Sequence, residues 1–256
     1  MEQNLVHSNE RVDDLQLNGL KLIQNPDWFC FGVDAVLLAD YAAKNIKKGS
    51  TVLDLCSGNG IIPLLLSQKS PAGSLIGLEV QPEVADMANR SVKLNGLSHK
   101  IHVKTGDLKE APEQFGRSFF QYITCNPPYK EAGGGLLTQA DPVRIARHEI
   151  LCTLEDVVRV SSILLEPLGK LCMIHRPERL IEIIDCMKRY GLEPKRLRFV
   201  HPYPHKTATM ILIEAVRGGK PKLFLDPPLY IYQSPGVYSQ EIDEIYGRTQ
   251  ERKETL

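Results

Sequence analysis

Apolar and polar positions show two periodicities along most of the chain, one of two residues and one of helical spacing. Residues 14–24 alternate apolar and polar around Asn18-Gly19, a pattern typical of a β-hairpin. Beyond it, short apolar runs predict strands at residues 51–56, 74–80, 101–104, 119–125, 169–175, 196–203 and 207–216. Amphipathic segments predict helices at residues 35–44, 61–68, 82–95, 153–165, 177–190 and 239–246. Strands that alternate with helices indicate an α/β fold.

A glycine-rich turn, residues 57–60, joins the first central strand to the next helix. Its glycines let the backbone turn sharply and a ligand come close. Glu79 ends the next strand, where an acid can accept hydrogen bonds from both ribose hydroxyls of an adenosine cofactor. Pro63 stands where a dinucleotide fingerprint has its third glycine, and Asp54 would repel a pyrophosphate but suits a cationic amino acid tail. The pattern therefore favours S-adenosylmethionine (SAM) over NAD.

Residues Asn126-Pro127-Pro128-Tyr129 form a stiff corner after the strand 119–125. The strand must stop there because two consecutive prolines have no N–H to donate. The Asn126 amide offers one acceptor and two donors, and the Tyr129 ring offers a stacking face. The corner therefore suits a planar group with an N–H edge, without distinguishing an adenine from a glutamine amide.

Several other stretches could contribute to a site. Asp107, after the third strand, could hold the amino edge of a cofactor's adenine or could cap a turn. The aromatic cluster 28–31 is either core packing or a lid over a cofactor. The loop with Arg147 and His148 is either a solvated loop or a substrate-gripping one. The basic and aromatic stretch 195–206 suits RNA, although a basic edge strand also discourages edge pairing. Its candidate substrate contacts are Lys195, Arg196 and Arg198.

Composition and charge indicate the class of protein, the charge of its partner and its cellular compartment. The chain has 256 residues, 43% hydrophobic and 24% charged, with a formal net charge of zero. Residues 141–222 hold 15 basic and 10 acidic side chains, which suits an anionic partner. The six cysteines form no CxxC pair, which indicates no zinc site and a reducing cytoplasm. The charged first 20 residues predict no secretory signal, and the longest apolar run, residues 61–66, is too short to span a membrane.

These motifs together resemble a known family. Residues 52–60 are similar to the SAM-binding motif of class I methyltransferases. Residues 126–129 are similar to the corner of amino-methyltransferases, which act on adenine N6, cytosine N4 or glutamine amide nitrogen. Residues 31–39 and 146–149 resemble the bacterial valine-tRNA adenine-N6 methyltransferase family, and the likeness runs over about residues 14–216. It implies a Rossmann-like α/β fold with a seven-stranded, mostly parallel sheet, a final antiparallel strand, helices on both faces and an N-terminal hairpin.

The resemblance also implies roles for individual residues. SAM would donate the methyl group, S-adenosylhomocysteine would be the product, and a tRNA adenine near the anticodon would be the substrate in the cytoplasm. The expected SAM contacts are Phe31, Asp34, Asp54, Gly58, Asn59, Gly60, Glu79, Val80, Asp107 and Asn126. The expected catalytic residues are Asn126, Pro127 and Tyr129. The expected substrate contacts are Pro128, Tyr129, Arg147, His148 and the three basic residues named above. No metal is required.

We expect residues 1–32 to form a hairpin extension, residues 33–220 the methyltransferase domain and residues 221–256 a C-terminal extension. Other functions remain open at this point. A glutamine-amide methyltransferase acting on a peptide release factor would use the same corner, but such enzymes usually carry a helical domain where this chain has a hairpin. An rRNA adenine-N6 methyltransferase would share the chemistry. An inactive SAM- or RNA-binding module is disfavoured because Asn126 and Tyr129 are both present.

Overall fold

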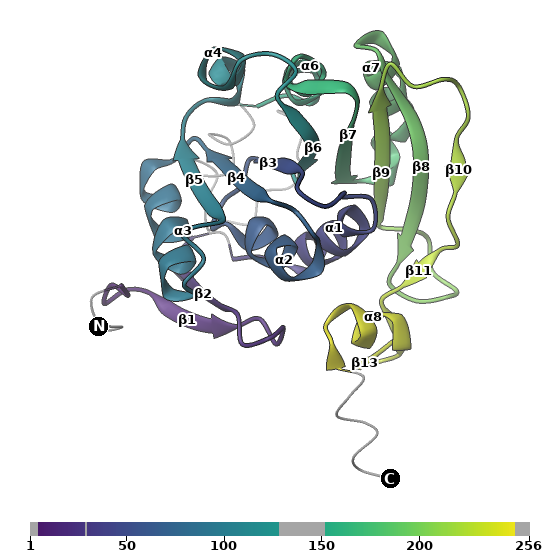
Figure 1. Ribbon diagram of the computed structural model, residues 1–256. Coiled ribbons are helices and arrows are strands. Elements are labelled where there is room, and N and C mark those ends of the chain that lie inside the picture. The colour runs from purple at the N-terminus through teal and green to yellow at the C-terminus, as the bar shows by residue number, and fades with distance from the viewer. Residues whose placement is uncertain (1–4, 29, 128–151, 249–256) are drawn as a thin grey trace.

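A single sheet of nine strands runs through the computed structural model, which describes residues 5–28, 30–127 and 152–248 (Figure 1). Its strands are β3 (Thr51–Leu55), β4 (Ser74–Glu79), β5 (Ile101–Thr105), β6 (Phe120–Cys125), β7 (Leu165–His175), β8 (Leu192–His201), β9 (Met210–Arg217), β10 (Phe224–Leu225) and β11 (Leu229–Tyr230). The order is β10-β8-β9-β7-β6-β3-β4-β5, and β11 also pairs with β8.

The direction of the strands confirms the predicted mostly parallel sheet. Strands β5, β4, β3, β6 and β7 are parallel neighbours, and β9 runs antiparallel between β7 and β8. The seven predicted strands correspond to β3–β9. Two short strands extend the sheet further, because β10 and β11 pair in parallel with β8. The interpretation of the basic stretch as an edge strand is therefore wrong, since β8 has neighbours on both sides.

Helices cover both faces of the sheet (Figure 1). One layer consists of α1 (Val33–Ala43), α2 (Ile61–Lys69) and α3 (Pro82–Leu94). The other consists of α4 (Ala111–Phe115), α6 (Leu154–Leu164) and α7 (Leu180–Arg189). Two short 3-10 turns, η2 (Leu108–Glu110) and η3 (Pro177–Arg179), precede α4 and α7. Successive strand residues face opposite layers, so Val52 joins the core beneath α1 and α2 and Leu53 joins the core beneath α6 and α7.

The N-terminal hairpin is present as predicted. Strands β1 (Arg11–Asp14) and β2 (Lys21–Gln24) pair antiparallel. Asn18 and Gly19 turn the chain with φ angles of 50° and 72°, the left-handed region that this dipeptide favours. The hairpin is fixed to α3, because the Ile23 amide donates to Ser91 Oγ over 2.9 Å.

The C-terminal segment ends against the turn of the hairpin, between β1 and β2. It contains β12 (Tyr232–Ser234), β13 (Val237–Tyr238) and α8 (Gln240–Ile245), which confirms the short helix predicted there. Arg248 Nε donates to Gln16 Oε1 over 2.9 Å, and Lys69 Nζ donates to the Ile245 carbonyl over 2.5 Å. The division at residues 32 and 220 stays a prediction.

The helices α6 and α1 begin at different kinds of capping residue. Thr153 caps α6, because its hydroxyl accepts from the Asp156 amide and Asp156 reciprocates. At the start of α1, Gly32 holds the cap position, and Asp34 lies inside the first turn. No helix in the described ranges is long and apolar enough to cross a membrane.

Candidate active site

The loop between β3 and α2 turns through left-handed backbone conformations. Cys56, Gly58 and Gly60 have φ angles of 57°, 54° and 78°. A Cβ on Gly60 would come within 3.1 Å of Ala88 Cβ in α3, so this position needs both the conformational freedom and the small size of glycine. The turn thereby brings its backbone to the carboxyl edge of the sheet, as the sequence predicted.

Glu79 lies directly against this turn at the carboxyl end of β4. Its Oε2 accepts from the Gly58 amide over 2.9 Å, and its Oε1 accepts from the Gln81 amide over 3.0 Å. The side chain is buried, with 5% of its surface exposed. Oε1 also accepts from Gln81 Nε2 over 3.1 Å, which uses both of its lone pairs, whereas Oε2 retains capacity for a ribose hydroxyl. Val80 follows it and is half-buried.

Asp54 is a carboxyl group enclosed in the sheet. It is 1% exposed, and Thr124 Oγ1 on β6 donates to its Oδ1 over 2.7 Å. Burial raises the pKa of Asp54 to about 7, an effect that the Thr124 hydrogen bond opposes. Its Oδ2 has no hydrogen-bond partner in the described part of the chain. A buried acceptor of this kind fits the cationic amino group of an amino acid tail.

Asn126 follows β6 at the same edge of the sheet, and its amide is held by α1. Asn126 Nδ2 donates to Asp34 Oδ2 over 3.1 Å. A carboxylate only accepts, so the bond directs the amide nitrogen toward Asp34 and turns the carbonyl oxygen away. Asp34 is itself held, because its Oδ1 accepts from the Ala35 amide over 2.9 Å. A Cβ on Gly32 would meet that oxygen at 2.8 Å, so glycine leaves the carboxylate its place.

A glutamine that no motif indicated connects the hairpin to the glycine turn. Gln24, at the end of β2, is 2% exposed. Its Oε1 accepts from Asn59 Nδ2 over 3.0 Å and from the Phe31 amide over 3.1 Å. Phe31 packs against the core beneath α1 and α2. The structure thus brings two predicted SAM contacts together through a residue whose only sequence signal was its place at a strand end.

Asp107 has the turn-capping role that was one of its two interpretations. Its Oδ1 accepts from the Lys109 amide over 2.8 Å at the start of η2. It lies half-buried after β5, at the same edge of the sheet as Glu79. Its contact with adenine stays a prediction.

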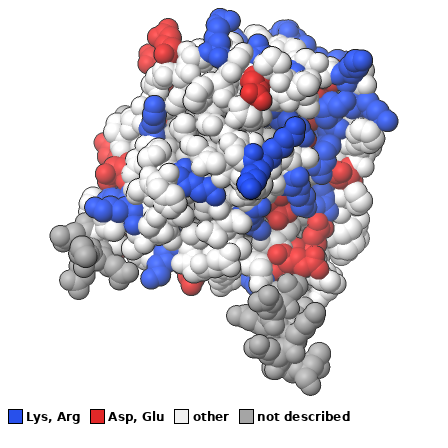
Figure 2. Space-filling view, in the orientation of Figure 1, with Lys and Arg blue, Asp and Glu red and all other residues white. Residues whose placement is uncertain are grey.

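Lys and Arg side chains gather on the side of the molecule where β8–β10 lie (Figure 2). Arg196 pairs with Asp226 over 2.8 Å and lies over the Tyr41 ring. Arg198 is 8% exposed and makes two 2.7 Å bonds to Glu241. These guanidinium groups therefore join the C-terminal segment to the sheet. The Nζ atom of the third residue, Lys195, donates to the Lys220 carbonyl over 2.8 Å. Contact of the three residues with RNA stays a prediction.

The remaining predicted site residues, Pro128, Tyr129, Arg147 and His148, lie outside the described residues. Pro127 is described and is buried at the end of β6. Within the described ranges, no group of three or more His, Cys, Asp or Glu side chains is arranged to hold a metal ion.

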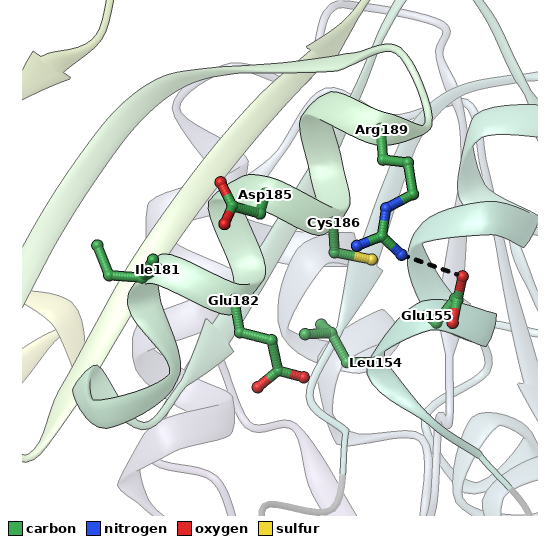
Figure 3. A pocket seen from close by; sticks show the side chains of 7 residues that line it. All are labelled: Leu154, Glu155, Ile181, Glu182, Asp185, Cys186 and Arg189. Carbon is green, nitrogen blue, oxygen red and sulfur yellow. Dashed lines mark hydrogen bonds and ion pairs between the residues drawn. The ribbon is translucent and has the colours of Figure 1, made fainter.

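A hollow of about 380 Å³ lies between α6 and α7, apart from the residues described above (Figure 3). Its lining consists of Leu154, Glu155, Ile181, Glu182, Asp185, Cys186 and Arg189. The lone cation, Arg189, points to Glu155 and is 3.4 Å from its Oε1. Three carboxylates make this hollow unsuitable for a polyanion.

Solved structures with this fold include methyltransferases. A protein of Agrobacterium tumefaciens, described as a predicted O-methyltransferase, has a TM-score of 0.68 at 23% identity, and the match covers 84% of this chain and 96% of that one. Geranyl diphosphate C-methyltransferase of Streptomyces coelicolor, in complex with S-adenosylhomocysteine, has a TM-score of 0.53 at 13% identity, with 71% and 75% covered. The fold is that of the class I methyltransferases, which confirms the predicted fold class.

Sequence relatives narrow the class to a family. The methyltransferase small domain family model matches residues 32–179. The tRNA1(Val) (adenine(37)-N6)-methyltransferase of Porphyromonas gingivalis is 32% identical over 219 residues, 82% of this chain and 84% of its own. That of Parabacteroides distasonis is 30% identical over 195 residues, 75% and 79% of the two chains. The chain belongs to the tRNA1(Val) (adenine(37)-N6)-methyltransferase family, as its motifs predicted.

Proposed function

We propose that this protein transfers a methyl group from SAM to the exocyclic N6 of an adenine in tRNA, next to the anticodon. The observation that carries the proposal is the position of Asn126, whose amide is oriented by Asp34 at the same sheet edge as Asp54 and Glu79. Membership of a family whose relatives are named for adenine 37 of tRNA1(Val) supports this substrate.

The residues at this edge fit SAM, which when bound supplies a methyl group on a sulfonium centre. The buried and unpartnered Oδ2 of Asp54 would accept from its cationic amino group. Glu79 would accept from a ribose hydroxyl, and the backbone at Gly58 and Gly60 would lie beside the ligand without obstructing side chains. Asp107 would hold the adenine amino edge.

The amine of adenine is a weak nucleophile, because its lone pair is delocalised into the purine ring. The Asn126 amide oxygen and the Pro127 carbonyl would accept hydrogen bonds from its N–H groups. These bonds strengthen as positive charge develops on nitrogen, so they stabilise the transition state more than the ground state. One proton leaves N6 once the new N–C bond has formed. Tyr129 would stack on the base after it leaves its neighbours in the loop.

Asp34 would act through Asn126. An asparagine amide can rotate by half a turn about its last side-chain bond, which would present NH2 instead of oxygen to the amine. The carboxylate favours the productive orientation because it accepts only from the nitrogen end. Proline at position 127 limits movement of the backbone that carries the second acceptor.

The test is incubation of the purified protein with methyl-labelled SAM and, separately, total tRNA, ribosomes and a peptide release factor. We expect label in tRNA, recovered as N6-methyladenosine after nuclease digestion. Label on a release-factor glutamine or on rRNA would overturn the substrate. The Asn126→Ala variant should keep its SAM affinity in calorimetry and lose about a hundredfold or more in turnover. Stabilisation against heat by NAD rather than SAM would overturn the cofactor.

A further inference from the structure

The turn between β8 and β9, residues 202–209, lies at the same edge of the sheet as Asn126. Strand β9 is antiparallel to both β7 and β8, so β8 ends at the edge where β6 and β7 end. The turn is fastened there, because Arg176 Nη1, just after β7, donates to the Thr209 carbonyl over 3.2 Å. It lies beside β11 and next to α8 (Figure 1).

Five aromatic side chains form a continuous column from this turn into the C-terminal segment. The ring of His205 stacks on Tyr203 with centroids 5.9 Å apart, and Tyr203 contacts Tyr232 at 5.4 Å. Tyr232 stacks on Tyr238 at 5.1 Å, and Tyr238 stacks on Tyr246 at 6.3 Å. The four tyrosines are half-buried, whereas His205 is exposed. The column therefore presents a ring to solvent at its His205 end.

The inner end of the column packs against the protein core. The Tyr246 ring contacts the core beneath α1 and α2, which Phe31 and Val33 also join. Burial raises the pKa of the Tyr246 hydroxyl to about 12. The Arg248 guanidinium covers the Tyr246 ring at 4.4 Å. The column consequently extends from the core beneath α1 to an exposed turn at the carboxyl edge of the sheet.

The outer end has the chemistry of a single-stranded RNA contact. Lys206 follows His205 and is exposed, and residues 195–209 contain no Asp or Glu. Pro202 and Pro204 stiffen the turn, and His201 Nδ1 lies 2.7 Å from the Lys206 carbonyl, so little conformational freedom is left to lose on binding.

Acidic side chains of the C-terminal segment would repel the phosphates of an RNA, but most of them lie beside arginines. Asp226 is paired with Arg196 and Glu241 with Arg198. Asp243 lies 3.9 Å from Arg248. Three of the four acidic residues between positions 226 and 248 thus face an arginine, and no ion pair among the described residues involves Lys206.

We propose that Tyr203, His205 and Lys206 form a docking site for the unpaired bases beside the target adenine. His205 would stack on one base, supported by Tyr203 behind it, and the Lys206 ammonium would contact a phosphate. The site rests on the proposed function, because a tRNA anticodon loop is the single strand that would reach it.

The test compares a His205→Ala/Lys206→Ala variant with the wild-type protein on an anticodon stem-loop transcript. We expect the KM and the Kd for this RNA to rise about tenfold, since loss of one stacked base has an effect of this order. The kcat at saturating RNA and the Kd for SAM should stay within about twofold, because neither side chain contacts the reacting atoms. His205→Trp should keep the affinity, because a larger ring preserves the stacking.

The matched control is Lys220→Ala/Lys222→Ala. It removes two exposed cations that lie near the amino end of β8, away from the turn that follows its carboxyl end. It should leave the KM and its salt dependence within about twofold of the wild-type values, because neither lysine lies at the turn. An unchanged KM in the first variant, or an equal rise in the control, would overturn the docking site. A wild-type protein that methylates no tRNA would overturn the proposed function instead, and binding of the stem-loop on filters would still decide the site.

Discussion

The amide nitrogen of Asn126 donates to Oδ2 of Asp34 over 3.1 Å, across 92 positions of sequence. The bond joins the corner after β6 to the first turn of α1, so a helix on one face of the sheet sets the orientation of a group at its edge. A carboxylate bonded to the Asn126 amide is placed to orient the acceptor oxygen of that amide. The contact of Asp34 with SAM, which the resemblance implied, stays a prediction.

Removal of this carboxylate should therefore affect turnover more than SAM binding. We expect Asp34→Ala to lower kcat about tenfold to a hundredfold, because misdirection of one catalytic group has effects of this size. Asp34→Asn should retain more activity, since its side-chain oxygen can still accept from Asn126. Single-turnover kinetics at saturating SAM measure the loss, and calorimetry measures SAM affinity. A loss confined to SAM affinity would instead support the predicted contact of Asp34 with SAM.

The double variant Asp34→Ala/Asn126→Ala separates orientation from folding. If Asp34 acts only through Asn126, its removal should add little once the amide is gone, so the two effects on kcat should not be additive. Additive losses would contradict the positioning role. A thermal unfolding midpoint close to that of Asn126→Ala alone would exclude a general loss of structure.

The glycine turn, the acid at Glu79 and the hairpin were predictable because each depends on neighbouring residues. A strand followed by residues 57–60 and a helix can hardly form without a left-handed turn, and Asn18-Gly19 specifies its own turn type. The order of predicted strands also placed Glu79 and Asn126 at one edge, because parallel strands end together. Interactions between neighbouring residues thus made most of the fold and the position of the site predictable.

Pairings between distant residues were not predictable. Arg198 looks the same in sequence whether it faces solvent or Glu241, which is 43 positions away. The pairing of β10 and β11 with β8 was not predictable either, because strands of two residues each do not specify a partner. Gln24 accepts two hydrogen bonds inside the protein, although a glutamine at a strand end usually faces water. In each case tertiary packing, rather than propensity, decides the partner.

Asp54 should make both stability and SAM binding depend on pH. Burial raises its pKa from an ordinary 3.8 to about 7, so the folded protein disfavours the ionised form. The stability that the neutral carboxyl group gives is complete below about pH 4 and is lost as the pH rises to about 7. Asp54→Asn should therefore gain unfolding free energy over wild type across this range, on the order of a few kcal/mol at pH 7. Urea titrations at a series of pH values measure the difference.

SAM binding should show the opposite dependence, because its cationic amino group pairs with the ionised carboxylate. We expect the wild-type Kd to tighten about tenfold per pH unit below pH 7 and to level off above it. Calorimetry in buffers of different ionisation enthalpy should detect one proton released at about pH 6. Asp54→Asn should bind weakly with no such release; equal proton release in both proteins would show that another group titrates.

Gln24 should couple the hairpin to the cofactor site. Gln24→Met leaves the Asn59 amide and the Phe31 N–H without their acceptor, which we expect to lower the free energy of unfolding by about 1–3 kcal/mol and to weaken SAM binding. Gln121→Met is the matched control, because Gln121 Oε1 also accepts a backbone N–H, that of Thr51, but at the amino end of β3. It should reduce stability and leave the Kd for SAM unchanged. An equal change of Kd in both variants would contradict the coupling.

Arg198 and Glu241 should act as one structural unit that holds the C-terminal segment on the sheet. Each of Arg198→Ala and Glu241→Ala should lower the free energy of unfolding by about 1–3 kcal/mol, and the double variant should lose less than the sum. Both should also expose residues 221–248 to protease, because the Arg198 guanidinium bonds Pro227 as well as Glu241.

The same pair of variants decides whether Arg198 contacts RNA, as its sequence neighbourhood predicted. A phosphate contact would reduce the slope of log K against log salt by about one in Arg198→Ala, whereas Glu241→Ala would keep the slope. We expect instead that both variants keep the wild-type slope, because the guanidinium is buried against Glu241 and away from solvent. A reduced slope in Arg198→Ala alone would place this guanidinium on the tRNA and would require the C-terminal segment to move when RNA binds.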